Sequence, residues 1–333
     1  MSIISYLHEL FNEQKCNEYI HQLRWQDRQL QCPRCQSNKV KPWGNYLCFP
    51  GLKRYKCKAC NRTFNDKTNT ALSGCKIPVK TVILSSFLLC LSSSSRRISR
   101  ETGSHIRTAY HWCWYFRNAA ISYEISRQLE GIVEADEIYQ TAGNKGRCKT
   151  GKKELNHLPR KRGKKQPPGR GHYEKDSPAI IAYVSRNDNT VLTVVKDFTI
   201  ETVQKSTNIA VKSGSTIYTD SAKSYKALIG YIHDCVNHSQ KEYARGEVHE
   251  NRSENCFSLL RPYLGVFRGI GKANLPGYIG FFQFMRNHCK LNAFEQSEMI
   301  LHAILNPDIT NKVKYGDFVK QLDHFKLLQS AIN

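Results

Sequence analysis

Two C-x-x-C pairs constrain the fold of this chain more than any other feature. Cys32 and Cys35 form the first pair, Cys57 and Cys60 form the second, and twenty-one residues separate the two. Structural zinc is held by four thiolates in a tetrahedron, and each pair supplies two sulfurs from one tight turn. The pattern predicts a zinc ribbon over residues 31–70 that holds one structural Zn²⁺. Residues 1–30 are expected to form a helical lead-in.

The predicted ribbon is basic and interleaved with aromatic residues. Many ribbons of this kind bind nucleic acid, whereas others only join proteins, and the pattern allows both. The basic residues are Lys39, Lys41, Lys53, Arg54, Lys56, Lys58 and Arg62, and the aromatic ones are Trp43, Tyr46, Phe49, Tyr55 and Phe64.

The charge balance of the chain narrows the class of partner. Its 333 residues contain 50 Lys and Arg against 28 Asp and Glu, a formal net charge of +22. An excess of this size is unusual for an enzyme of small metabolites and fits a nucleic-acid backbone. The hydrophobic fraction of 40% is sufficient for real cores, which excludes global disorder.

Export and membrane insertion are not expected. The longest apolar run, residues 82–91, is about half of a bilayer span, and residues 1–5 do not resemble a signal peptide. The thirteen cysteines then favour thiols and metal ligands over disulfides. We expect a cytoplasmic protein without a membrane partner.

Residues 76–128 read as helical, and part of this region has the pattern of a helix-turn-helix. A short helix before Gly103 and a longer basic, aromatic helix capped by Ser104 would be held together by Ile98, Ile106 and Tyr110. Residues at the front of the second helix would face DNA, and an ordinary antiparallel helix pair is the alternative. The DNA-facing candidates are Ser104, His105, Arg107 and Thr108.

Short β-type runs alternate with helical segments from residue 131 onward, which indicates a mixed α/β domain over 131–292. Strands are expected at 131–139, 179–185, 190–195 and 215–219, and a helical tail is expected over 293–333. Acidic residues lie on or beside three of the elements. The first strand carries Glu134, Asp136 and Glu137, Asp220 ends the last strand before an expected helix, and Glu250 and Glu254 lie near the start of another helix.

Three converging carboxylates can hold two divalent ions that activate an attacking oxygen and stabilise the leaving oxygen at a phosphodiester. Mg²⁺ suits such a site because it prefers carboxylate oxygens and keeps water ligands, and Mn²⁺ is an alternative ion. Asn251 and Arg261 share one helix face with Glu254, so Arg261 is a candidate phosphate contact.

Over residues 31–292 the chain resembles the DDE-type transposases of bacterial insertion sequences, in the zinc-ribbon group related to eukaryotic Merlin elements. The cysteine pairs, Val133-Glu134-Ala135-Asp136-Glu137, Tyr218-Thr219-Asp220 and His249-x-Asn251-x-x-Glu254 carry the resemblance. Asp220 and Glu254 are 34 positions apart, a spacing habitual in this superfamily. The resemblance implies a multidomain α+β chain with a ribonuclease-H-like catalytic domain, and Asp136, Asp220 and Glu254 match the catalytic triad.

The chain departs from the family pattern at several positions. Arg261 stands where the family usually has Lys, and Phe257 stands where it has Trp. Some members are described by an asparagine as third ligand, so Asn251 and Asn255 are rivals of Glu254. His238 and His249 are further candidates for the lining of the site.

A strongly basic insertion over residues 143–176 interrupts the predicted catalytic domain. It contains twelve basic residues against three acidic ones, and we expect it to clamp phosphates rather than only to aid solubility. Candidate DNA contacts in it are Lys161, Arg162, Lys164 and Lys165.

The expected function is metal-dependent strand cleavage and strand transfer at the ends of an insertion sequence. The partners would be terminal inverted repeats and target DNA, bound by a homodimer or a larger assembly. A DNA-binding regulator with an inactive nuclease domain, and a ribonuclease-H-like nuclease without joining activity, are the alternatives.

Overall fold

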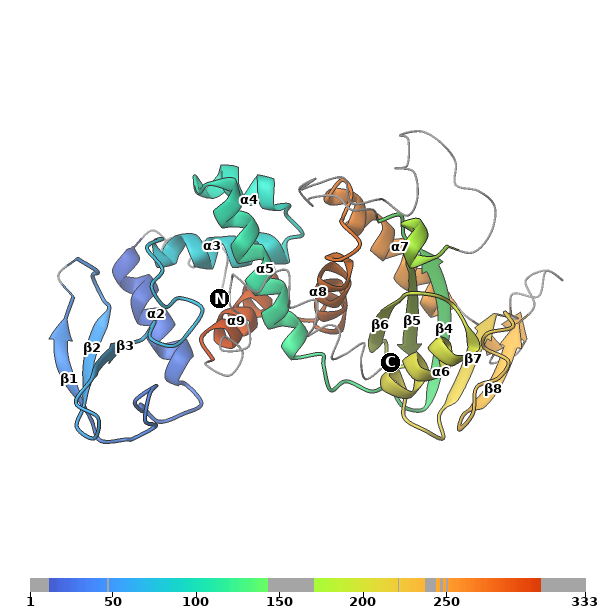
Figure 1. The fold of residues 1–333 in the computed structure, drawn as a ribbon, viewed down its shortest axis with the longest axis horizontal. Helices are drawn as coiled ribbons and strands as arrows, with labels where there is room; N and C mark the ends of the chain where they lie inside the picture. The colour runs from blue at the N-terminus through green and yellow to red at the C-terminus, as the bar shows by residue number, and fades with distance from the viewer. Residues whose placement is uncertain are drawn as a thin grey trace. The chain divides into compact units, whose positions relative to one another are not determined.

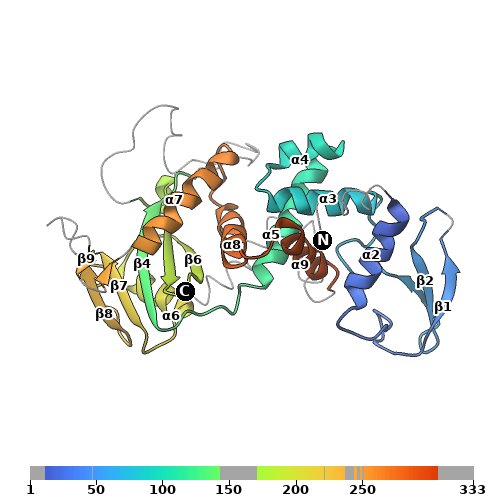
Figure 2. The same cartoon turned by 180° about the vertical axis from the view of Figure 1, so that it is seen from behind.

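The computed structural model describes residues 12–46, 48–142, 171–220, 222–236, 244–245, 248–249 and 251–306. They form two compact units. The first contains residues up to Tyr123 together with those from His288, and the second runs from Glu124 to Asn287. Figures 1 and 2 show the elements of each unit from opposite sides.

The first unit contains the expected ribbon. Strands β1 (Val40–Asn45), β2 (Lys53–Cys57) and β3 (Thr63–Asn65) form an antiparallel sheet in that order. One face buries Tyr55, Cys57 and Phe64 together with Cys32. Helix α2 (Glu13–Trp25) is fastened to the end of the ribbon, because the Arg24 guanidinium donates to the backbone carbonyls of Asp66 and Thr68.

Helices make up the rest of the first unit. They are α3 (Val79–Cys90), α4 (Ser95–Thr102), α5 (Ile106–Ser122) and α9 (Ala293–Ile304). Helix α9 packs against α2, α3 and α5, and the Phe87 and Phe294 rings stack 4.2 Å apart. The sequence predicted a separate tail from residue 293, whereas α9 belongs to the N-terminal unit; residues 307–333 lie outside the described part.

Helices α4 and α5 meet at Gly103, whose φ of 65° lies in the left-handed region that glycine tolerates. Two details of the predicted helix-turn-helix were wrong. The N-cap of α5 is His105, whose Nδ1 accepts from the Arg107 backbone N–H, because the Ser104 hydroxyl is engaged with Thr102. Ile98 is buried as predicted, but Ile106 and Tyr110 are exposed, and the α5 residues Ala109, Trp112 and Cys113 are buried in their place.

The second unit is built on a five-stranded mixed sheet. Its strands are β4 (Ile132–Tyr139), β5 (Ala179–Ser185), β6 (Thr190–Val195), β7 (Thr216–Asp220) and β8 (Ile232–Val236). The order is β6-β5-β4-β7-β8, in which β5 is antiparallel to both neighbours and the other strands run parallel to β4. These directions and this order are those of a ribonuclease-H-like fold, which confirms the predicted fold class.

Helices cover both faces of this sheet. Helix α6 (Ile200–Ala210) covers one face, where Val203 and Ala210 pack with Val133, Ala135 and Ile217. Helix α7 (Asn251–Val266) packs against β4 and β5, and α8 (Leu275–Asn287) packs against β6. Figure 1 shows α6 in front of the strands, and in the reversed view of Figure 2 α7 lies in front.

The remaining short elements of this unit are η1 (Tyr173–Lys175), β9 (Ala244–Arg245) and β10 (Val248–His249). The prediction of a helix after Asp220 was wrong. Residues 223–227 form turns instead, because Tyr225 packs in the core on the α6 side of the sheet and few residues remain before β8 begins.

Candidate catalytic site and zinc centre

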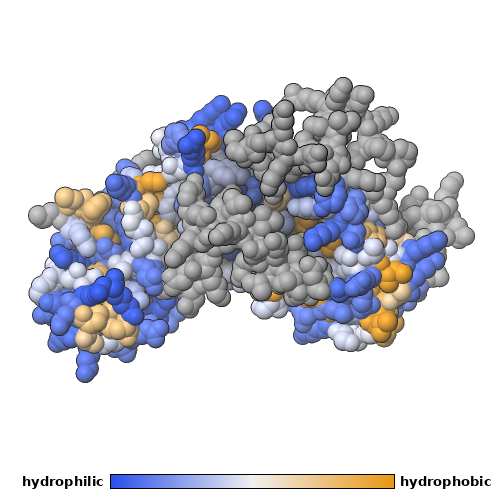
Figure 3. Space-filling view, in the orientation of Figure 1, coloured by the Kyte–Doolittle hydropathy of each residue, from blue (hydrophilic) through white to orange (hydrophobic). Residues whose placement is uncertain are grey.

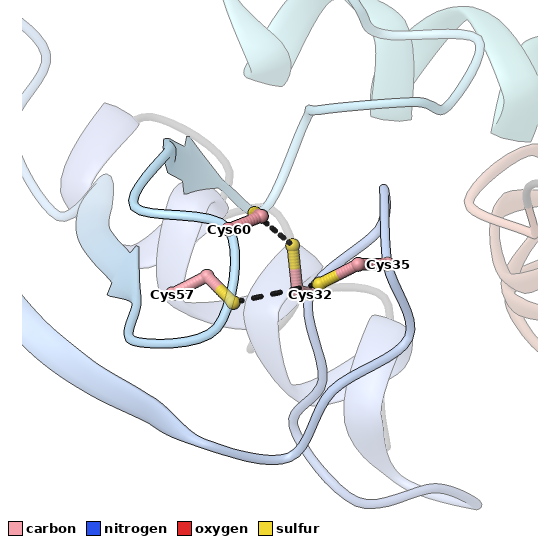
Figure 4. A group of neighbouring side chains, drawn as sticks. All are labelled: Cys32, Cys35, Cys57 and Cys60. Atoms are coloured by element: carbon pink, nitrogen blue, oxygen red, sulfur yellow. Dashed lines mark hydrogen bonds between the residues drawn. The ribbon is translucent and has the colours of Figure 1, made fainter.

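The four paired cysteines form one cluster in the ribbon. Cys32 and Cys35 come from the turn before β1, Cys57 ends β2, and Cys60 follows in the next turn. The Sγ atoms all lie within 4.8 Å of one another, and the Cys32–Cys60 and Cys35–Cys57 sulfurs are 3.7 and 3.6 Å apart. Figure 4 shows the sulfurs turned toward a common centre.

These distances test whether a zinc ion fits. A tetrahedron with Zn–S bonds of about 2.3 Å has edges of about 3.8 Å, close to the two observed separations. The backbone favours thiolate as well, since hydrogen bonds from the Cys60 and Ala59 N–H groups lower the pKa of Cys57 to about 7. The cluster is therefore a site for one structural zinc ion, with all four positions taken by protein.

Asp136 and Asp220 lie on neighbouring parallel strands. Ala135 of β4 is paired with Thr219 of β7, so the two aspartates that follow occupy equivalent positions. Side chains alternate along a strand, and Val133 and Ala135 face α6, so Asp136 faces the α7 side of the sheet. Both aspartates are half-buried.

Hydrogen bonds from the following backbone fix one oxygen of each aspartate. The Asp136 Oδ1 accepts from the Glu137 N–H at 2.7 Å, and the Asp220 Oδ1 accepts from the Ala222 N–H at 2.9 Å. Burial raises the pKa of Tyr225 well above its ordinary value, and the charges of Glu137, Asp136 and Asp220 raise it further. All three carboxylates therefore act electrostatically on this buried tyrosine.

Glu254 lies in the first turn of α7, with its side chain exposed. Asn251 and Arg261 are exposed on the same face of the helix, as expected from their spacing. The start of α7 is held to the sheet by Glu134. This residue is 0% exposed, and its Oε2 accepts from the Arg252 backbone N–H at 2.7 Å.

The donor chemistry of the three acids fits Mg²⁺ or Mn²⁺, which prefer carboxylate oxygens. Within the described residues, however, the four cysteines are the group of three or more candidate ligands whose atoms all lie within 4.8 Å. Among the same described residues, Asp136, Asp220 and Glu254 are not such a group. Ligands shared between two ions about 4 Å apart need not meet the closer limit.

The structure describes only some of the remaining candidate residues. His105 and Arg107 are exposed at the start of α5, and Ser104 is half-buried beside them. His249 is placed only by its backbone in β10. His238 and the insertion residues Lys161, Arg162, Lys164 and Lys165 lie outside the described residues.

Sequence reasoning missed two residues of the sheet that carries the acids. His233 of β8 lies 2.9 Å from the Thr219 hydroxyl, and burial lowers its pKa. Its strand was not predicted, because the segment is short and mixes polar with apolar residues. In the structure Ile232 is exposed. Glu134 belonged to the acidic run of β4, and alternation alone would have placed it on the same face as Asp136.

Comparison with known proteins agrees with this architecture. Residues 11–63 match the transposase zinc-ribbon domain, and residues 128–287 match the ISXO2-like transposase domain. A protein described as an uncharacterized protein in transposable element ISH50 of Halobacterium salinarum is 30% identical over 300 residues, which are 88% of this chain and 97% of that relative. The chain belongs to the ISXO2-like transposases.

Two further findings concern this transposase as a whole. No solved structure matches it. No helix in the described part of the chain is long and apolar enough to cross a membrane. Membership of the family makes DNA the macromolecule on which it acts.

Proposed function

We propose that this transposase cuts and joins DNA strands at the ends of an insertion sequence, with Asp136, Asp220 and Glu254 as the metal-binding carboxylates. The observation that carries the proposal is the equivalent placement of Asp136 and Asp220 on parallel strands β4 and β7. Glu254 enters from α7, which packs on β4. When bound, two Mg²⁺ ions activate the attacking oxygen and stabilise the leaving one.

The protein supplies position and charge for this chemistry. Asp136 and Asp220 hold their carboxylates through backbone hydrogen bonds, so they need little reorganisation when DNA arrives. Arg261, exposed two turns after Glu254, contacts a phosphate of the bound strand. The helix pair α4–α5 and the ribbon hold the terminal repeat, and the basic insertion holds the backbone. Two ends must be paired, so two or more copies assemble on DNA.

Neutral variants of the two aspartates test this proposal. Asp136→Asn and Asp220→Asn should each lower cleavage of a labelled transposon-end duplex by at least about 10³-fold, because an amide cannot replace a metal-binding carboxylate. End binding, measured by mobility shift in Ca²⁺, should change less than about threefold, since phosphate contacts dominate affinity. Glu201→Gln, on exposed α6, removes the same charge and should leave both unchanged.

Comparison of Glu254→Gln with Asn251→Ala identifies the third ligand. Loss of cleavage in the first variant alone assigns Glu254, and loss in the second alone assigns Asn251. Full cleavage by Asp136→Asn or Asp220→Asn contradicts the proposed site. A wild-type protein that binds ends and cuts none in Mg²⁺ or Mn²⁺ is the regulator instead.

A further inference from the structure

The first unit contains a pocket of about 340 Å³ beside the ribbon. The ends of β1 and β3 and the chain leading toward α3 surround it. Among the residues that line it are two aromatic rings, two lysines and two small polar side chains, namely Tyr46, Phe49, Lys67, Lys76, Asn65 and Ser73. The zinc site and the carboxylates have no residue in this pocket.

Lys67 is the unusual residue of this pocket. Its side chain is buried, with only 8% of the residue exposed, yet within the described chain its ammonium makes no hydrogen bond and no ion pair. The Phe49 ring, with its centroid 5.6 Å away, is its neighbour. Burial lowers the pKa of Lys67, although the charges of Glu13 and Cys75 act against this. The ammonium is not among the fully buried polar atoms of the described residues, and an anion in the pocket that Lys67 lines would give it an acceptor.

The aromatic walls narrow the class of anion. Tyr46 and Phe49 lie edge to face with ring centroids 6.3 Å apart, and 44% of Phe49 is exposed. The Tyr46 hydroxyl is held by the Asn65 side-chain amide. A flat heterocycle can stack on such rings while its phosphate reaches the lysine. The combination fits a nucleotide better than a free inorganic anion.

The pocket continues into a cationic face of the ribbon. Trp43 is 43% exposed, and the ammonium groups of Lys41 and Lys56 lie 4.9 and 4.6 Å from its ring centroid. Lys41 and Lys56 are paired across β1 and β2. Further along β2, the Arg54 guanidinium lies 5.8 Å from the Tyr46 ring centroid at the pocket. In Figure 3 hydrophilic side chains cover much of the visible ribbon, at the left, with paler ones among them.

We propose that this face of the ribbon binds an unpaired stretch of DNA and that the pocket receives one nucleotide, with its phosphate at Lys67 and its base against Tyr46 and Phe49. Paired bases are stacked on each other, so only an unpaired base can offer its face to these rings. The inference rests on the proposed function only in taking DNA as the ligand. It requires nothing of the carboxylates.

Fluorescence anisotropy of labelled oligonucleotides tests this inference with the full-length, zinc-loaded protein and without added Mg²⁺ or Mn²⁺. The probes are a 15-nucleotide single strand and the duplex of the same sequence. Lys67→Met should bind the single strand about tenfold more weakly, and Phe49→Leu about fivefold more weakly, while duplex affinity falls less than about twofold. Lys290→Met is the matched control; it removes the same charge from an exposed position of the first unit outside the ribbon and should change both affinities less than about twofold.

Thermal unfolding of the free protein separates binding from folding. Removal of a buried unpaired charge should leave the Tm of Lys67→Met equal or higher, so affinity and stability should move in opposite directions. Single-strand affinity that is unchanged in both Lys67→Met and Phe49→Leu overturns the inference. An equal loss of duplex affinity contradicts the proposed preference for an unpaired strand. A mononucleotide that competes as well as the oligonucleotide contradicts DNA as the ligand. Asp136→Asn should bind like the wild type, so failure of the catalytic proposal leaves this test intact.

Discussion

At the scale of single residues, Glu134 connects the sheet to the helix that carries Glu254. Its buried carboxylate accepts the Arg252 N–H and lies 3.4 Å from the Arg186 guanidinium. Glu134→Ala should lower the free energy of unfolding by about 1–3 kcal/mol, because a buried donor loses its acceptor. Glu134→Gln keeps an acceptor and should lose less. Urea unfolding measures both.

Glu130→Gln is the control for this prediction. Glu130 is exposed and pairs with Lys212 on the surface, so its loss should change stability by less than about 1 kcal/mol. Equal effects of Glu130→Gln and Glu134→Ala would contradict the role given to Glu134. Sequence reasoning weighed the acids of this run as metal ligands, surface charges or helix caps and not as buried contacts of the sheet, because burial is a property of the packed sheet and α7 that no single residue reveals.

At the scale of elements, helix α8 closes the outer edge of the sheet with side chains. The Gln283 Oε1 accepts from the Leu192 N–H, and the Asn287 side chain binds both the N–H and the carbonyl of Thr190. Gln283→Met should lower stability by about 1–3 kcal/mol, because the buried Leu192 N–H is left without a partner. Hydrogen exchange should then accelerate at the Leu192 amide more than at Ile181 in the sheet centre.

Gln204→Met is a matched control for that variant. Gln204 likewise accepts a backbone N–H, that of Ile229, with its side-chain oxygen, but in an exposed place where water replaces the bond. Its stability should change by less than about 1 kcal/mol. A Leu192 amide that exchanges at the wild-type rate in Gln283→Met would contradict the edge-closing role of α8.

The elements also show how far sequence reasoning reaches. Strands β5 and β6 have the predicted bounds because both faces are buried and the residues are β-branched or apolar. Strand β8 was missed because it is short and mixed, with Ile232 exposed. The expectation that Asp136 and Asp220 lie close together came from the family resemblance and not from hydrophobic periodicity, since strand pairing is non-local. The unpaired state of Lys67 is likewise visible only after folding.

At the scale of the whole molecule, α9 shows why the units could not be assigned by sequence position alone. It follows the second unit along the chain but belongs to the first. The aromatic and aliphatic residues of α9 correctly predicted a helix, which begins with a capping box at Asn292 and Glu295. These residues do not reveal which helices α9 packs against. Ser297 meets Ser86 of α3, and Ala71 donates to the Ile304 carbonyl, across more than two hundred residues of sequence.

Zinc removal should affect the two units differently. The four-cysteine cluster lies in the first unit, whereas the buried core around Val133 and Tyr183 belongs to the second and contains no zinc ligand. Cys32→Ser should lose its zinc, measured by atomic absorption, and lower the melting transition of the first unit, because zinc binding there is folding free energy of several kcal/mol. The calorimetric transition of the second unit should stay. Cys289→Ser, an exposed free thiol, should keep zinc and both transitions. If both transitions fell together in Cys32→Ser, the ribbon would be supporting the catalytic unit as well as its own sheet.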